Sequence, residues 1–174
     1  DGNGRTGRAL IHLVLRRRGL TPLYVPPISV VLAGDKDAYI AGLDAYARGN
    51  SEVWLTTFAA ATAQSAGMAA DYLRQVTALQ DRWRAMLRAS SNPRADSVAW
   101  ALIDVMPAHP MISVPIAVTA TGRTKAVVNE ALAHLEAAGV VIRASHGQRN
   151  RTWEAAGLLD LLADLEAGAS ARVR

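Results

Sequence analysis

The chain has 174 residues, of which 51% are hydrophobic and 20% are charged. This balance is typical of a folded globular protein of one or two domains and argues against disorder. The chain has no cysteine, which excludes disulfides, thiolate zinc sites and cysteine nucleophiles. The best candidate for a membrane span, Leu23–Ala33, contains two prolines and is far shorter than the roughly 20 residues that a span needs. With no secretory signal recognisable, we expect a cytoplasmic protein with no membrane partner.

The net charge of +4 is unevenly distributed along the chain. Residues 1–93 carry all of the excess positive charge, and residues 94–174 contain equal numbers of basic and acidic side chains. A polyanionic partner for the whole chain is therefore not expected, and local clusters of basic residues matter more. One cluster is formed by the arginines near the N-terminus, and the other by Arg143, His146, Arg149 and Arg151.

The first element expected is a helix over Thr6–Arg18, where apolar residues recur at helical spacing. Its last residues are arginines and Gly19 follows, a combination that suits a helix C-terminus. Thr21–Pro27 is expected to be irregular because it contains three prolines. A second helix is expected over Asp35–Arg48. Its apolar face comprises Tyr39, Ile40, Leu43 and Ala47.

A long helical pattern runs from Glu52 to about Ala89, well beyond the usual helix length of about 8–20 residues. We therefore expect a bend or a break near Ser65–Gly67. The aromatic residues of this segment recur at helical spacing and are expected in the core: Trp54, Phe58, Tyr72 and Trp83. Ser90–Pro93 is predicted to be a linker.

The C-terminal half has a different pattern. Four helices are expected, over Ala95–Met106, Ser113–Ala120, Thr124–Ala138 and Leu158–Ala167. A β hairpin is expected between the last two, with strands at Val140–Ile142 and Arg151–Glu154. The inward residues of the third helix are expected to be Val127, Val128, Ala131, Leu132 and Leu135. Helix, short helix, turn, helix and hairpin is the order of a winged helix-turn-helix domain.

The first eight residues are Asp1-Gly2-Asn3-Gly4-Arg5-Thr6-Gly7-Arg8. Glycines before a helix let backbone N–H groups converge on an anion, and the helix N-terminus adds its positive end. Arg5 and Arg8 are three residues apart, on one face, and Asp1 could hold Mg²⁺ beside phosphate oxygens. The pattern predicts a triphosphate cradle, with an ordinary Asp-Gly and Asn-Gly turn as the alternative. It is not a P-loop, because no Gly-Lys-Ser/Thr follows.

This segment resembles the second part of the Fic family signature, His-x-Phe-x-Asp/Glu-Gly-Asn-Gly-Arg-x-x-Arg. Asp1–Arg8 matches its six fixed positions from the acid onward. The segments Leu23–Ala33, Tyr39–Asn50 and Trp54–Phe58 are similar to the region after the motif in bacterial Fic proteins. The winged-helix tail also resembles one common in that family, so the likeness covers nearly the whole chain.

The resemblance implies transfer of AMP from ATP, with Mg²⁺, to a Ser, Thr or Tyr hydroxyl of a target protein. By the same resemblance, Asp1 is the Mg²⁺-holding acid and Arg5 and Arg8 lie near the β- and γ-phosphates. Gly2, Asn3 and Gly4 form the phosphate-binding anion hole. Tyr39 falls where related sequences place an aromatic residue that lines the nucleoside cleft; a core position is the alternative.

One departure from the family pattern is the missing motif histidine, because the chain begins at the acid that follows it. None of His12, His109, His134 or His146 matches that histidine, and His12 is expected to be structural. The resemblance therefore implies a chain truncated inside the motif, and we expect no catalysis by this chain alone. No inhibitory Ser/Thr-x-x-x-Glu-Gly/Asn helix is recognisable, so an antitoxin or a second copy of the chain is a further candidate partner.

DNA is another candidate partner, through the expected winged helix. Its candidate contacts are Arg123, Lys125 and Asn129 at the third helix and Arg149 and Arg151 on the wing. The same helix carries Glu130 and Glu136, and residues 94–174 have no net charge. A packing or dimerisation module therefore remains the alternative to DNA binding.

Together these patterns predict a mainly α fold. Residues 1–91 are expected to be the C-terminal part of a Fic-type helical core whose N-terminal part is missing. A winged helix-turn-helix over 92–155 and a terminal helix and tail over 156–174 are expected to follow. The expected function is that of a fragment of a protein adenylyltransferase with a regulatory or DNA-binding tail. The alternative is a non-catalytic transcription regulator or interaction scaffold with a vestigial Fic-like region.

Overall fold

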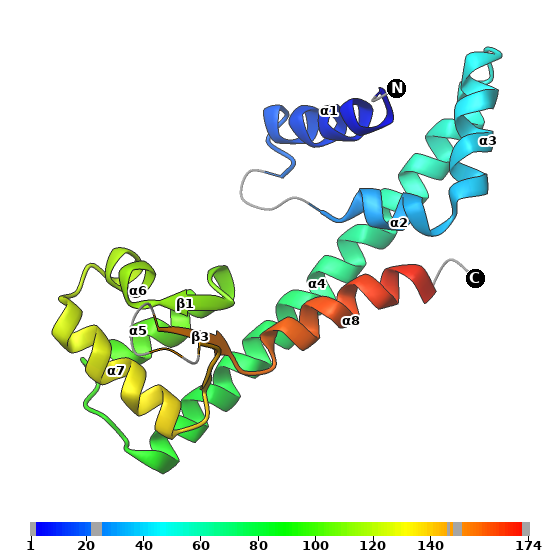
Figure 1. Ribbon diagram of the computed structural model, residues 1–174. Helices are drawn as coiled ribbons and strands as arrows, with labels where there is room; N and C mark the ends of the chain where they lie inside the picture. Colours follow the sequence, from blue (N-terminus) through cyan, green and yellow to red (C-terminus); the bar gives the residue numbers. More distant parts are fainter. Residues whose placement is uncertain (1–2, 22–25, 146, 148–150, 172–174) are drawn as a thin grey trace. The chain divides into compact units, whose positions relative to one another are not determined.

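The computed structural model describes residues 3–21, 26–145, 147 and 151–171. Over these residues the chain is mainly α-helical, with eight α helices, one short 3-10 helix and one three-stranded sheet (Figure 1). The chain divides into two compact units. The first comprises the described residues of 1–72 and 164–174, and the second comprises residues 73–163. Among the described residues, no helix has both the length and the apolar character needed to cross a membrane.

The first unit is built from short helices around the N-terminal part of a long one. Its elements are α1 (Asn3–Arg17), α2 (Ile28–Gly34), α3 (Lys36–Ala47), the first part of α4 (Ser51–Ser90) and the end of α8 (Leu158–Ala171). Asp35 ends α2 and caps α3, because its carboxylate accepts a hydrogen bond from the Ala38 backbone N–H at 2.9 Å. The core consists of Ile28, Val31, Leu32, Ala61 and Met68, with Ile11, Leu15, Tyr39, Phe58 and Leu165 packed against it.

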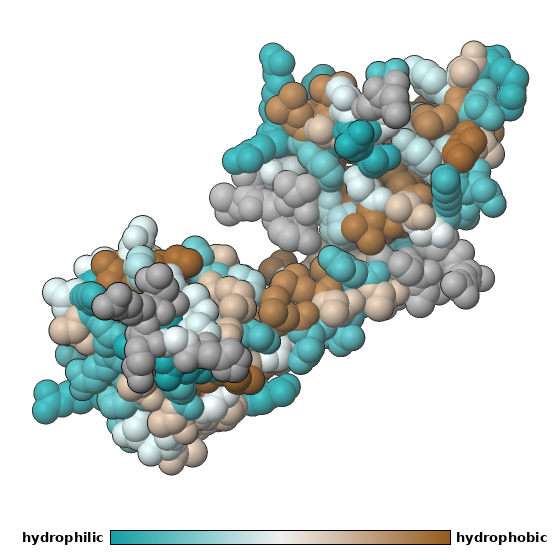
Figure 2. Space-filling view, viewed as in Figure 1, coloured by the Kyte–Doolittle hydropathy of each residue, from teal (hydrophilic) through white to brown (hydrophobic). Residues whose placement is uncertain are grey.

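Of the apolar face expected for the second helix, Tyr39 packs against the core, whereas Ile40 and Leu43 lie at the surface. Ile40 is 44% exposed and Leu43 is 40% exposed, and apolar side chains lie at the surface over α1, α3 and the start of α4 (Figure 2). The buried residue of α3 is Gly42, where an added Cβ atom would lie 3.2 Å from Trp54 Cε3. Helix α3 therefore packs closely against Trp54 of α4 at Gly42. The apolar pattern of the sequence did not predict this contact, because glycine is not part of that pattern.

The long helix α4 continues for 40 residues, so the break expected near Ser65–Gly67 is absent. Ser65 is buried, and its hydroxyl donates to the Thr62 carbonyl at 3.1 Å. A serine satisfied within its own helix does not need to interrupt it. Of the four aromatic residues expected in the core, Trp83 is 1% exposed, and Phe58 is half-buried and packs against the core of the first unit. Trp54 and Tyr72 are half-buried.

The second unit contains the second part of α4, three further α helices, one 3-10 helix, a small antiparallel sheet and the start of α8. Its elements after α4 are α5 (Val98–Val105), the 3-10 helix η1 (Met106–Ala108), β1 (Met111–Ser113), α6 (Val114–Thr121), α7 (Lys125–Ala137), β2 (Val141–Arg143) and β3 (Thr152–Ala155). The strand order is β1-β3-β2, with Ile112 and Arg143 both opposite Trp153. The helices and the hairpin match the expected elements, and β1 is an additional strand that the sequence pattern did not predict.

The core of the second unit includes the second part of α4. Trp83 and Leu87 are buried with residues of α5, α7 and β3, and Trp83 Nε1 donates to the Ala156 carbonyl at 3.1 Å. The boundary between the two compact units therefore lies inside α4, between Tyr72 and Leu73, whereas the sequence placed its linker at Ser90–Pro93. In α7 the expected inward residues are buried except Val127, which is 43% exposed.

Candidate functional site

The glycine-rich segment at the N-terminus is helical in its described part. Helix α1 begins at Asn3, so the expectation of a loop before a helix that starts at Thr6 was wrong for these residues. Asn3, Gly4 and Arg5 are exposed, and Arg8 is half-buried. Asp1 and Gly2, the predicted metal-holding acid and the first glycine of the anion hole, lie outside the described residues.

The Arg8 side chain lies close to the backbone of Gly4. A Cβ atom added at Gly4 would lie 3.6 Å from Arg8 Nη1, because residues four apart share one face of a helix. The first turn of α1 contains no acidic residue. The positive end of the helix and the basic side chains of Arg5 and Arg8 therefore lie at the same end of α1.

A helix end of this kind, with arginines beside it, suits an anion. The carboxylate predicted to hold Mg²⁺ is that of Asp1, outside the described residues. Within the described part of the chain, no three or more Asp, Glu or His side chains form a group that could hold a metal ion.

Tyr39 of α3 lies in a packed environment. It is half-buried against the core of the first unit, and its ring meets Trp54 edge-on with centroids 5.7 Å apart. These are the contacts that a core position predicts. His12 of α1 has a buried Nδ1 atom with no hydrogen-bond partner among the described residues.

The predicted DNA-binding residues lie around α7 and the adjoining hairpin. Arg123 and Lys125 are exposed at the N-terminal end of α7. The N-cap residue Thr124 makes no side-chain hydrogen bond to this helix end. Arg149 lies outside the described residues.

Asn129 and Arg151 are hydrogen-bonded to each other. Arg151 Nη2 donates to Asn129 Oδ1 at 2.8 Å, and Asn129 Nδ2 donates to the Lys125 carbonyl at 2.8 Å. Both side chains are half-buried. The structure therefore brings together these two residues, both predicted to contact DNA, and pairs them with each other.

Two residues absent from the sequence prediction join this contact. Trp153 is buried, and its Nε1 donates to Glu136 Oε2 at 2.8 Å. The Arg151 guanidinium lies over the Trp153 ring, 5.2 Å from its centroid. The sequence carried a signal for these contacts. Arg151 and Trp153 are two residues apart, which places them on the same face of the expected strand, and Asn129 and Glu136 are two turns apart on the same face of the expected helix.

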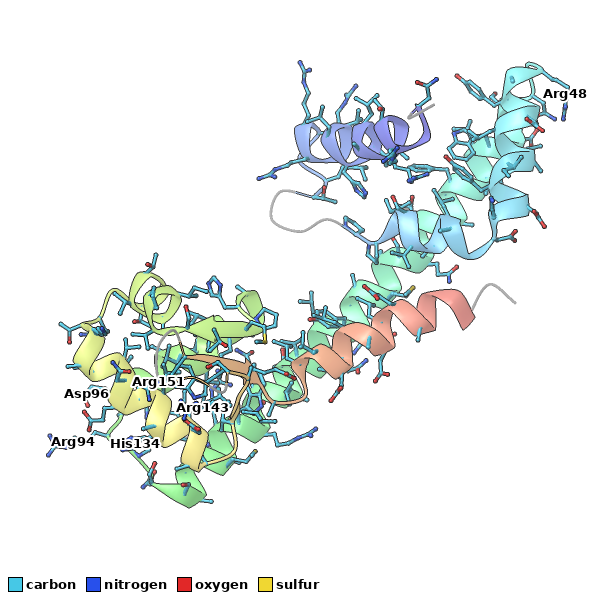
Figure 3. The ribbon with its side chains drawn as sticks, viewed as in Figure 1. Arg48, Arg94, Asp96, His134, Arg143 and Arg151 are labelled. Carbon is cyan, nitrogen blue, oxygen red and sulfur yellow. The ribbon has the colours of Figure 1, made fainter. Side chains whose placement is uncertain are left out.

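A groove lies on the other flank of α7. It has a volume of about 580 Å³, and Arg94, Asp96, Arg123, Glu130 and His134 are among its lining residues. Figure 3 shows Arg143 and Arg151 on the hairpin side of α7, and Arg94 and Asp96 on the side of this groove. The acidic residues Asp96 and Glu130 make that flank less suited to a polyanion than the hairpin side.

The sequence matches no protein-family model and no curated protein.

Proposed function

We propose that this chain is part of a Fic-type protein adenylyltransferase that binds ATP and Mg²⁺ at the N-terminal end of α1. The observation that carries the proposal is the arrangement of this helix end, where Arg8 lies against Gly4 and the first turn has no acid. The proposal also rests on the sequence Asp1–Arg8, which resembles the Fic signature.

In this proposal each residue neutralises or positions charge. When bound, ATP with Mg²⁺ supplies the AMP that a Ser, Thr or Tyr hydroxyl of the target accepts, with pyrophosphate as the leaving group. Asp1 holds the metal ion, and Arg5 and Arg8 neutralise the β- and γ-phosphates. The first backbone N–H groups of α1, at Asn3 and Gly4, donate to phosphate oxygens. Such phosphoryl transfer depends mainly on positioning and charge stabilisation.

The direct test measures AMP transfer from labelled ATP by the natural gene product. Arg8→Ala removes a donor to the phosphates, and loss of one such donor lowers kcat by about 10²–10³-fold. Thr6→Ala is the control, since that position is variable in the motif. Equal activity of Arg8→Ala and Thr6→Ala would reject the assignment. Absence of transfer by the gene product itself would favour the non-catalytic regulator or scaffold.

A second function, DNA binding, is proposed for residues 98–155. The order α5, β1, α6, α7, β2, β3 supports a winged helix, with α7 as the helix that enters the major groove. The exposed Arg123 and Lys125 at the N-terminal end of α7 favour this function. That end of the helix is the part that reads bases in helix-turn-helix proteins.

The test of DNA binding measures the affinity for duplex DNA as a function of salt concentration. Each phosphate contact releases about 0.9 counterions, so Arg123→Ala should lower the salt slope by about one unit. Arg48→Ala, which removes an exposed arginine at the end of α3, should leave the slope unchanged. Absence of salt-dependent binding would make this domain an interaction module.

A further inference from the structure

We infer that Arg151 is a positioning residue that holds the hairpin on α7 and does not contact DNA phosphates. The inference deepens the proposed DNA-binding function and rests on it. It changes the sequence-based assignment, in which Arg151 grips a phosphate and Asn129 reads a base.

Arg151 has two partners among the described residues, Asn129 and Trp153. One edge of its guanidinium donates to Asn129 Oδ1 at 2.8 Å, and the group lies 5.2 Å from the Trp153 ring centroid. An arginine stacked on an aromatic ring and hydrogen-bonded along one edge is held in a single geometry. These contacts hold the guanidinium against α7 and the Trp153 ring in a half-buried site, and a phosphate contact would compete with them.

Both partners of Arg151 are themselves fixed. Trp153 is buried in β3 and donates to Glu136 of α7 at 2.8 Å. Asn129 is fixed by its bond to the Lys125 carbonyl in the same helix. Arg151, directly before β3, and Trp153, in β3, therefore attach the hairpin to α7 at Asn129 and Glu136, two turns apart. We call these four residues the hairpin latch.

The exposed basic side chains lie outside the latch. Arg123 and Lys125 are exposed, and Lys125 lies one turn from Asn129. If the latch fixes the hairpin beside this end of α7, the helix and the hairpin meet the DNA as one rigid surface. Arg123 and Lys125 then make the phosphate contacts. The latch affects DNA affinity only by fixing the hairpin relative to these two residues.

The experiment compares single and double variants of the whole chain on a mixed-sequence DNA duplex at several salt concentrations. Arg151→Ala and Asn129→Ala should each weaken binding by about tenfold without changing the salt slope. The double variant should be no weaker than either single variant, because both break the same contact. Arg123→Ala is the control that does change the slope.

The substitution Arg151→Lys separates positioning from phosphate contact. A lysine keeps the charge but not the planar fork, so it should bind DNA as weakly as Arg151→Ala. A salt slope lowered by about one unit in Arg151→Ala and restored in Arg151→Lys would overturn the inference.

If the unaltered chain does not bind the duplex, the DNA-binding proposal fails and hydrogen exchange still tests the latch. Backbone amides of Thr152–Ala155 should then exchange faster in Arg151→Ala and Asn129→Ala, to the same extent as in the double variant. Unchanged exchange in these variants would overturn the latch itself.

Discussion

Substitution by alanine should have opposite effects on stability at two glycines, Gly122 and Gly67. Gly122 lies between α6 and α7 with φ at 65°, in the left-handed region. Gly67 lies inside α4, and a Cβ atom added there would meet nothing within 4 Å. A side chain is strained at the first position and favoured at the second.

Gly122→Ala should therefore destabilise the fold by about 1–2 kcal/mol. Gly67→Ala should stabilise it by about 0.5–1 kcal/mol, through helix propensity. Urea unfolding of the two variants measures both changes. Stabilisation by Gly122→Ala would contradict the left-handed conformation at this turn.

Trp83 carries a second prediction at the residue scale. It is 1% exposed, and its Nε1 donates to the Ala156 carbonyl, whereas the half-buried Trp100 donates to the Arg94 carbonyl at 3.0 Å. Trp83→Phe should cost about 1–3 kcal/mol, because the carbonyl loses its partner in a dry core. Trp100→Phe should cost less, since water can reach its partner. Thermal unfolding compares the two, and equal losses would contradict the burial of Trp83.

At the scale of elements, prediction from sequence succeeded where periodicity and end signals coincided. Helix α3 follows its cap at Asp35, and the helix α7 is bounded by Gly122 and Gly139, both at positive φ. The strand β1 was missed because its three residues pair with Thr152–Glu154, about forty positions away. Helix α2 was not predicted, since it begins directly after the two prolines that suggested irregular chain.

In the candidate site, too, the sequence predicted local relationships along a helix but not contacts between residues far apart in the chain. The sequence predicted that Arg5 and Arg8, three residues apart, share one face of a helix, and α1 contains both. The structure adds that Gly4 and Arg8 lie close together. The Asn129–Arg151 hydrogen bond joins residues 22 positions apart, on a helix and beside a strand. Such a contact depends on the tertiary fold. The sequence therefore predicted that Asn129 and Arg151 belong to one candidate DNA-binding surface, but not that they bond to each other.

At the scale of the whole molecule, the division inside α4 determines which segment can fold alone. Residues 73–163 contain Leu79, Trp83 and Leu87 together with the rest of the core of the second unit. A fragment of residues 73–163 should therefore unfold cooperatively. A fragment of 92–163, which starts after the predicted linker, should be unstable, because loss of one buried Leu or Trp costs about 2–5 kcal/mol. Circular dichroism during urea unfolding compares the fragments, and equal stability would place the boundary at the linker.

The proposed function depends on triphosphate binding at the N-terminal end of α1, and the most direct measurement of it is calorimetric titration of the 174-residue chain with Mg²⁺-ATP. The matched variants are Arg8→Ala and Arg16→Ala, which remove the same charge from the second and last turns of α1. We expect saturable binding that Arg8→Ala weakens about tenfold and Arg16→Ala leaves unchanged. Equal affinity in the two variants would contradict the proposed site.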